Sequence, residues 1–139
     1  MATSESLDAF LSEPRNVVVA GVSSSGRPVM TPNWFHWDGE RFYVSTTRDR
    51  FKYPMFTLNP RVQLLFDDST GFRSVIVNGK VEFWEDLGVT LPYFRAIRDK
   101  HGRPPVDDDT MRSGLEEENR VLLVVVPEKA SADWTAWGF

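Results

Sequence analysis

The sequence contains no cysteine among its 139 residues. This absence excludes disulfide bonds, thiolate metal ligands and a cysteine nucleophile. The two histidines, His36 and His101, have no cysteine beside them, so we expect no metal site. A chain without disulfides is typical of the cytoplasm, and we expect that location.

The sequence also lacks long apolar runs and an excess of positive charge. Its longest apolar run, residues 121–126, is too short to span a bilayer, and residues 1–6 lack the basic and apolar regions of a signal peptide. We therefore expect a soluble protein without a membrane partner. The formal charge of -4 and the pI near 5.2 argue against a general nucleic-acid surface. A local cationic run would then be a specific site.

The composition is otherwise that of a globular domain. Hydrophobic residues make up 41% and charged residues 26% of the chain, whereas the aromatic content of 13% stands out. A chain of this length suits one domain, which we place at residues 1–139, with one core.

Hydrophobic periodicity predicts strands at residues 17–22, 29–37, 41–46, 62–66, 72–84 and 120–126. Asp38-Gly39 is a strong hairpin signal, and Gly79 within a long strand predicts a bulge or a tight bend. Short helices are expected at residues 4–11, capped by Ser4 or Ser6, between residues 47 and 58, and from residue 87 to about 101. A further helix would follow the polar loop at residues 103–109, capped by Asp108 or Asp109. About six strands with these flanking helices predict a small, mostly antiparallel β-barrel.

A cationic cluster marks the junction between a predicted strand and the helix that follows it. Its members are Thr46, Thr47, Arg48, Arg50 and Lys52. Hydroxyls, guanidinium groups and an ammonium group near the free N–H groups of a helix start suit a phosphate. The alternative is a solvated loop in which Arg48 or Arg50 pairs with Asp49 or another carboxylate.

Aromatic residues are concentrated around the same region and could form the walls of a site for a planar ligand. The set is Trp34, Phe35, His36, Trp37, Phe42, Tyr43, Phe51 and Tyr53. Alternation along a strand places Trp34 and His36 on one face and Phe35 and Trp37 on the other, so only one row can line a pocket. The alternative is that these rings belong to the core or to a dimer contact.

An ordered series of short motifs resembles a known superfamily. The series is Ser25-Gly26-Arg27-Pro28, Thr31-Pro32-Asn33-Trp34-Phe35, Trp37-Asp38-Gly39, Phe42-Tyr43-Val44-Ser45-Thr46, a basic stretch ending in Lys52, and Asn59-Pro60-Arg61-Val62. It resembles the pyridoxamine 5'-phosphate oxidase-like superfamily, especially the branch that uses the deazaflavin coenzyme F420. The resemblance is clearest over residues 11–84. It implies a six-stranded split β-barrel and a homodimer with cofactor sites between the subunits.

The resemblance also implies roles for individual residues. Lys52 and Arg50 would bind the cofactor phosphate, with the hydroxyls of Thr46 and Thr47 beside it. Pro32, Asn33 and Trp34 would run along the cofactor ring. Arg61 would lie near an anionic tail, and a groove that also includes Arg48 favours the longer tail of F420 over FMN. The chain departs from the usual pattern at Met55, where the superfamily commonly has asparagine, and at Pro54.

The activity implied is that of an oxidoreductase, in which F420 supports hydride transfer to a conjugated or aromatic small molecule. His36 and Tyr43 are the only nearby candidates for a catalytic proton donor. The alternatives are an FMN-binding oxidoreductase and a non-catalytic protein that stores a cofactor, haem or another tetrapyrrole. Binding of single-stranded nucleic acid is physically conceivable for a small barrel, but the acidic net charge argues against it.

Overall fold

The computed structural model describes residues 2–139. The helices are α1 (Ser4–Ser12), α2 (Lys52–Leu58), α3 (Leu87–Lys100), α4 (Asp108–Glu117) and the 3-10 helix η1 (Ser131–Asp133). The strands are β1 (Val17–Val22), β2 (Pro28–Asn33), β3 (His36–Trp37), β4 (Phe42–Thr47), β5 (Arg61–Asp67), β6 (Ser74–Trp84), β7 (Arg120–Pro127) and β8 (Thr135–Trp137). None of these helices is long and apolar enough to cross a membrane.

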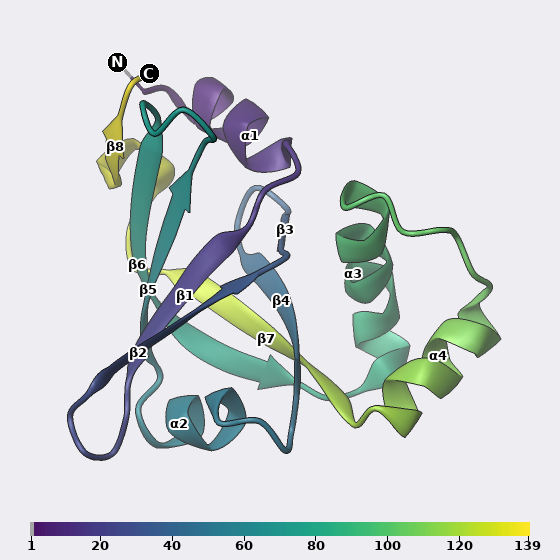
Figure 1. The fold of residues 1–139 in the computed structure, drawn as a ribbon. Coiled ribbons are helices and arrows are strands. Elements are labelled where there is room, and N and C mark those ends of the chain that lie inside the picture. The colour runs from purple at the N-terminus through teal and green to yellow at the C-terminus, as the bar shows by residue number, and fades with distance from the viewer. Residues whose placement is uncertain (1) are drawn as a thin grey trace.

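The strands form one antiparallel sheet in the order β2-β1-β5-β6-β7-β4-β3, and β8 pairs with β6. Figure 1 shows this sheet curled into a barrel, with α1 at one end, α2 at the other, and α3 and α4 beside β4 and β7. The predicted fold class, an antiparallel split barrel, is confirmed. The described residues contain eight strands rather than about six, because the stretch at residues 29–37 divides into β2 and β3 and the aromatic tail forms β8.

The core has two parts, which lie on opposite faces of the sheet. Inside the barrel, alternate residues of β1, β5 and β6 pack with α1, as Val19, Leu64 and Val77 do. On the outside of β4 and β7, a second cluster forms under α3 and α4 around Tyr43 and Leu122. Because β7 is covered on both sides, residues 121–125 are all buried, which explains their unbroken apolar run.

Three local predictions were wrong in detail. Thr3, rather than Ser4 or Ser6, caps α1 through a reciprocal bond with Ser6. Asp107, rather than Asp108 or Asp109, caps α4. Gly79 lies in an unbroken ladder and forms no bulge. A Cβ at Gly79 would lie 2.6 Å from the Val126 carbonyl oxygen, so the glycine permits a close approach between β6 and β7.

Candidate functional site

The barrel opens where the two ends of the sheet face each other. Strands β2 and β3 end the sheet order, and residues 34–35 connect them across this opening without ladder partners. The predicted ring wall, Pro32 to Trp34, lies on one side. The end of β4 and the start of α2 lie on the other, and the Lys52 Nζ donates a hydrogen bond to Thr31 Oγ1 on β2 at 3.1 Å. The structure therefore brings together the two segments that the sequence singled out.

Lys52 is the most unusual residue of this opening. Only 4% of the residue is exposed, and the Thr31 hydroxyl that it contacts lies 2.9 Å from the Asn33 side-chain amide. Burial, and then the nearby Arg50 charge, lower the pKa of Lys52. Within residues 2–139 it forms no ion pair. A buried ammonium group with three donors and no counter-charge fits an anion.

Thr46 and Thr47 are buried at the end of β4, with 1% and 6% of their surfaces exposed. Alternation places Thr46 on the face of Val44, toward the barrel interior, and Thr47 on the face of Ser45, toward α3 and α4. The Thr46 hydroxyl oxygen has no hydrogen-bond partner among the described residues. A buried hydroxyl without a partner also fits a ligand that accepts or donates a hydrogen bond. The strand geometry shows that the two threonines do not present their side chains to one face.

The three predicted arginines lie in different surroundings. Arg48 donates to Glu85 Oε1 from Nε and to Asn119 Oδ1 from Nη1, both at 2.9 Å. This is the ion pair that the alternative interpretation anticipated, and it fixes the loop before α2. Arg50 is exposed and lies close enough to Lys52 to affect its pKa. Arg61 faces outward from the start of β5, in a separate hollow that it shares with Pro28.

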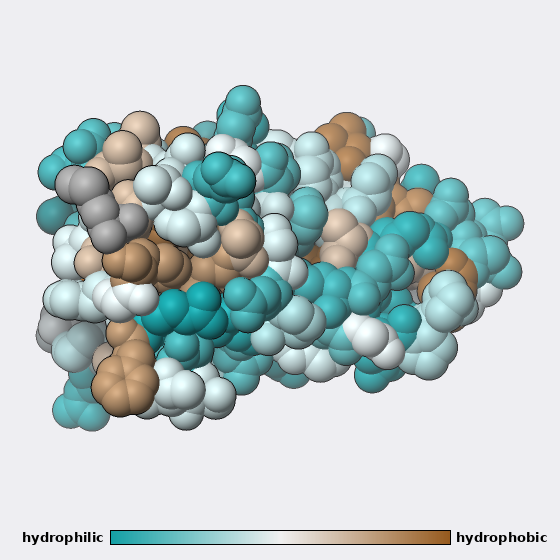
Figure 2. All heavy atoms as spheres, turned by 90° about the horizontal axis from the view of Figure 1, so that it is seen from above, coloured by the Kyte–Doolittle hydropathy of each residue, from teal (hydrophilic) through white to brown (hydrophobic). Residues whose placement is uncertain are grey.

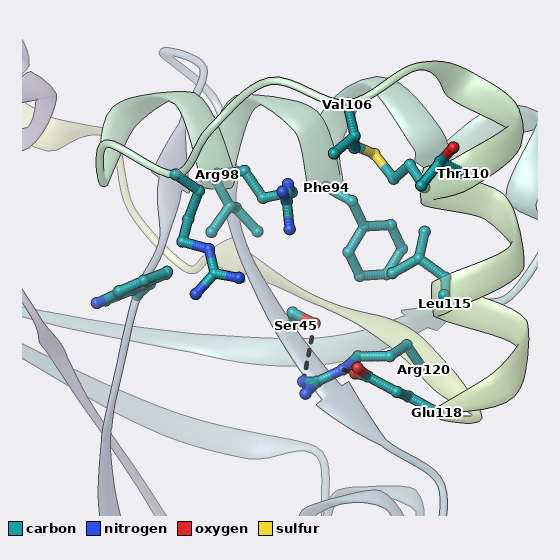
Figure 3. Close-up of a pocket in the computed structure, with 13 residues that line it drawn as sticks. Ser45, Phe94, Arg98, Val106, Thr110, Leu115, Glu118 and Arg120 are labelled. Carbon is teal, nitrogen blue, oxygen red and sulfur yellow. Dashed lines mark hydrogen bonds and ion pairs between the residues drawn. The ribbon is translucent and has the colours of Figure 1, made fainter.

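A pocket of about 470 Å³ lies between α3, α4 and the sheet, and Trp34 forms part of its wall. Figure 3 shows Phe94, Val106 and Leu115 pointing into it, above Ser45 and Arg120. Its apolar lining residues are Trp34, Phe94, Ile97, Val106, Met111 and Leu115. Its polar and charged lining residues are Ser45, Arg98, Arg103, Thr110, Glu118 and Arg120.

The pocket carries more positive than negative charge. Glu118 is the one carboxylate among the residues that line the pocket, and Arg120 pairs with it at 2.6 Å. Arg120 also donates a hydrogen bond to Ser45 Oγ at 3.2 Å. Arg98 donates to the Pro104 carbonyl at 3.1 Å, and neither Arg98 nor Arg103 forms an ion pair within the described chain. Apolar walls with two uncompensated guanidinium groups suit an apolar molecule that bears an acidic group.

The comparison with family sequences decides the assignment. The family described as pyridoxamine 5'-phosphate oxidase matches residues 3–132. The chain belongs to the pyridoxamine 5'-phosphate oxidase family. Membership in this oxidoreductase family confirms the resemblance carried by the motif series, and it agrees with the curled antiparallel sheet.

A curated relative is the pyridoxine/pyridoxamine 5'-phosphate oxidase of Escherichia fergusonii, which is 34% identical over 102 residues. The match covers 73% of this family member but only 44% of the relative, so the chain spans less than half of that oxidase.

Two solved structures cover nearly the whole chain. One, named F420 reductase, is 27% identical with a TM-score of 0.72, and the match covers 88% of this chain and 93% of that one. The other is the haem storage protein HutZ of Vibrio cholerae, at 18% identity and a TM-score of 0.76, covering 100% and 97% of the two chains. At that identity, the second likeness shows the fold alone.

The two nominated proton donors of this family member lie on the α3 side of the sheet. Tyr43 is fully buried and donates to Asp38 Oδ2 at 2.6 Å, while burial raises its pKa. Its hydroxyl therefore has a fixed partner and holds its proton at neutral pH. The His36 ring stacks on Tyr43 at 5.8 Å between centroids, and burial and the Lys100 charge lower its pKa. A catalytic role for either residue remains a prediction.

Sequence reasoning missed the pocket between α3 and α4. Its lining residues extend from residue 34 to residue 120 and come from β4, α3, α4, β7 and the intervening loops. No short motif joins them. The single signal was the pair of helical stretches around a polar loop, which did not show that Trp34 would lie beside them.

Proposed function

We propose that this protein is an oxidoreductase that uses coenzyme F420 in hydride transfer to a conjugated or aromatic small molecule. The observation that carries the proposal is the buried, unpaired Lys52 at the barrel opening, facing the predicted ring wall. The preference for F420 over FMN is supported by the likeness to the F420 reductase, which extends over most of both chains.

The residues at the opening fit the phosphate of such a cofactor. Lys52 would supply the charge, Arg50 a second exposed cation, and the unpartnered Thr46 hydroxyl a hydrogen bond. Pro32, Asn33 and Trp34 would bound its ring. When bound, the cofactor supplies the hydride chemistry, while the chain binds, orients and shields the reactants.

The pocket beside Trp34 is the proposed position of the substrate. Trp34 would border both the cofactor ring and the pocket that the aromatic and aliphatic side chains line. A planar conjugated molecule matches these walls, and an acidic substituent would pair with Arg98 or Arg103. We therefore expect conjugated substrates with a carboxylate or a similar group to be preferred over neutral ones.

A homodimer is part of the proposal. The ladder register places Pro32, Val18, Leu65 and Ile76 in one row across the outward face of four strands. By the same alternation, the exposed apolar residues Val22, Met30 and Trp137 lie on this face too. Figure 2 shows apolar side chains reaching the surface at the β8 end, whereas the α4 end is more hydrophilic.

An apolar face that extends across several strands suits a second copy of the chain. Because Pro32 belongs to both this row and the ring wall, the cofactor site would adjoin the interface. The outward-facing Arg61 would then belong to the cofactor site. A particle of twice the chain mass by light scattering is expected, and Met30→Glu should convert it to a monomer. A wild-type monomer at micromolar concentration would contradict this.

The test of the cofactor is a fluorescence titration with oxidised F420, reduced F420 and FMN. We expect F420 to bind, and Lys52→Ala to weaken binding by roughly ten- to a hundredfold, the range for a hydrogen-bonded charge. Lys129→Ala, at an exposed position after β7, is the matched control. Absence of binding for both cofactors, or no effect of Lys52→Ala, would refute the proposal.

The second candidate is an FMN-dependent oxidoreductase, which the 34% identity to the curated oxidase favours. Yellow protein that retains FMN through purification, with no affinity for F420, would decide for it.

A further inference from the structure

Trp34 belongs both to the predicted ring wall and to the wall of the α3–α4 pocket. It follows the last residue of β2, and 43% of its surface is exposed. Residue 34 takes part in no strand ladder of the described chain, so its backbone alone does not fix the indole ring. The position of the ring must therefore depend on a side-chain contact.

That contact is with His101, the residue that caps the C-terminus of α3. The two rings stack with their centroids 4.7 Å apart and their planes only 6° from parallel. Residues 67 positions apart in the chain thus hold the junction between the opening and the pocket. The stack covers one face of the indole and leaves its remaining exposed surface to a ligand.

The imidazole of His101 is itself oriented by the backbone. The Phe35 N–H donates to His101 Nε2 at 3.4 Å, and the Phe35 side chain is fully buried, which anchors this peptide. Nε2 can accept only when the imidazole is neutral, with its proton on Nδ1. Burial and the charge of Lys100 lower the pKa of His101, whereas Trp34 and Phe35 bring no charge to the ring.

We propose that neutral His101 is a positioning residue for Trp34, holding the indole at the edge where the cofactor opening and the substrate pocket meet. Protonation of His101 at low pH would place an N–H donor at Nε2, opposite the Phe35 N–H. The hydrogen bond would then break, and the imidazole would no longer hold the Trp34 ring. The inference extends the function proposed above. Its structural part depends on no bound cofactor.

The experiment uses protein in which 5-fluorotryptophan replaces tryptophan. Each of the five positions is expected to give its own fluorine NMR signal. Trp34→Phe identifies the Trp34 signal. His101→Phe keeps an aromatic ring but no acceptor, His101→Gln keeps an acceptor but no ring, and His101→Ala removes both. We expect the Trp34 signal to move furthest in the Ala variant and less in the other two, while the distant Trp137 signal stays in place.

Two further measurements distinguish the positioning of Trp34 by His101 from a general loss of structure. As the pH falls below 6.5, the Trp34 signal should titrate in the wild type but not in His101→Phe. Affinity for F420 should fall roughly threefold to tenfold in His101→Ala and be partly restored in His101→Phe, as expected for one lost stack.

An unmoved Trp34 signal in all three variants and across the pH range would overturn the inference, as would a joint shift of all five signals. If the Trp34 signal responds while the wild type binds neither F420 nor FMN, the proposed function fails and the positioning role stands. If the wild type binds F420 and the Trp34 signal stays unmoved, the positioning role fails and the proposed function stands.

Discussion

Replacing Lys52 with methionine should stabilise the unliganded protein while removing its affinity for the cofactor. The buried ammonium group has one hydrogen bond, to Thr31, and no counter-charge in the described chain. Desolvation of such an ion costs several kcal/mol in real proteins, and the one bond returns about 1.5–3 kcal/mol. Methionine has a similar length and no charge, so we expect a net gain of about 1–2 kcal/mol in the free energy of unfolding.

For a chain of this size such a gain corresponds to a rise in Tm of about 3–6 °C. Differential scanning calorimetry without ligand measures it. Because the folded-state pKa of Lys52 is lowered, the wild type gains stability as pH rises from that pKa toward the unfolded value near 10.5. The advantage of the Met variant should therefore shrink with rising pH.

Lys80→Met, at an exposed position of β6, controls for the loss of a lysine and should change stability by less than about 0.5 kcal/mol. A lower Tm for Lys52→Met, together with unchanged F420 affinity, would refute the idea that Lys52 is held unpaired for an anion.

Three further predictions concern the scaffold. Gly79→Ala should destabilise the protein by about 2 kcal/mol or more because its Cβ meets a carbonyl of β7, whereas Gly114→Ala, in open space on α4, should stabilise it by about 0.5–1 kcal/mol in urea unfolding. The pKa of Lys100 is lowered to about 7, chiefly by burial, so stability should rise with pH from about 7 toward 10.5. Lys100→Met should flatten that rise, and an unchanged slope would contradict the assignment. Tyr43→Phe should cost about 1–2 kcal/mol through the bond lost by Asp38; a fall in kcat measured well below the Tm of the variant would support the predicted role of Tyr43 as a proton donor, and an unchanged kcat would contradict it.

The sequence predicted most elements of the fold because their signals are local. The alternation in β5 and β6, the Asp38-Gly39 hairpin and the helical spacing before His101 each depend on neighbouring residues. Gly39 has the positive φ, 95°, that the hairpin required. The break between β2 and β3 was missed because residues 34–35 are as aromatic as the strands around them, and only the barrel opening deprives them of partners.

At the candidate site, the sequence identified the two segments that meet but not the surroundings of each side chain. The partners of Arg48 are Glu85 and Asn119, which are 37 and 71 positions away, so no local pattern could separate this arginine from Arg50. The stack of Trp34 on His101 was not predicted for the same reason, because the two residues are far apart in the sequence. Residue type indicated the chemistry, whereas long-range packing determined which residues are available for it.

The position of β7 has a consequence for how the protein is made. This strand lies between β6 and β4, yet it is formed by residues 120–127, well after both of them in the sequence. Until the ribosome has released this segment, β4 and β6 both present unpaired apolar edges, the kind of surface that favours association between nascent chains. We therefore expect the barrel to close only after residues 120–127 have been synthesised, and to close slowly because its central pairings join distant parts of the chain.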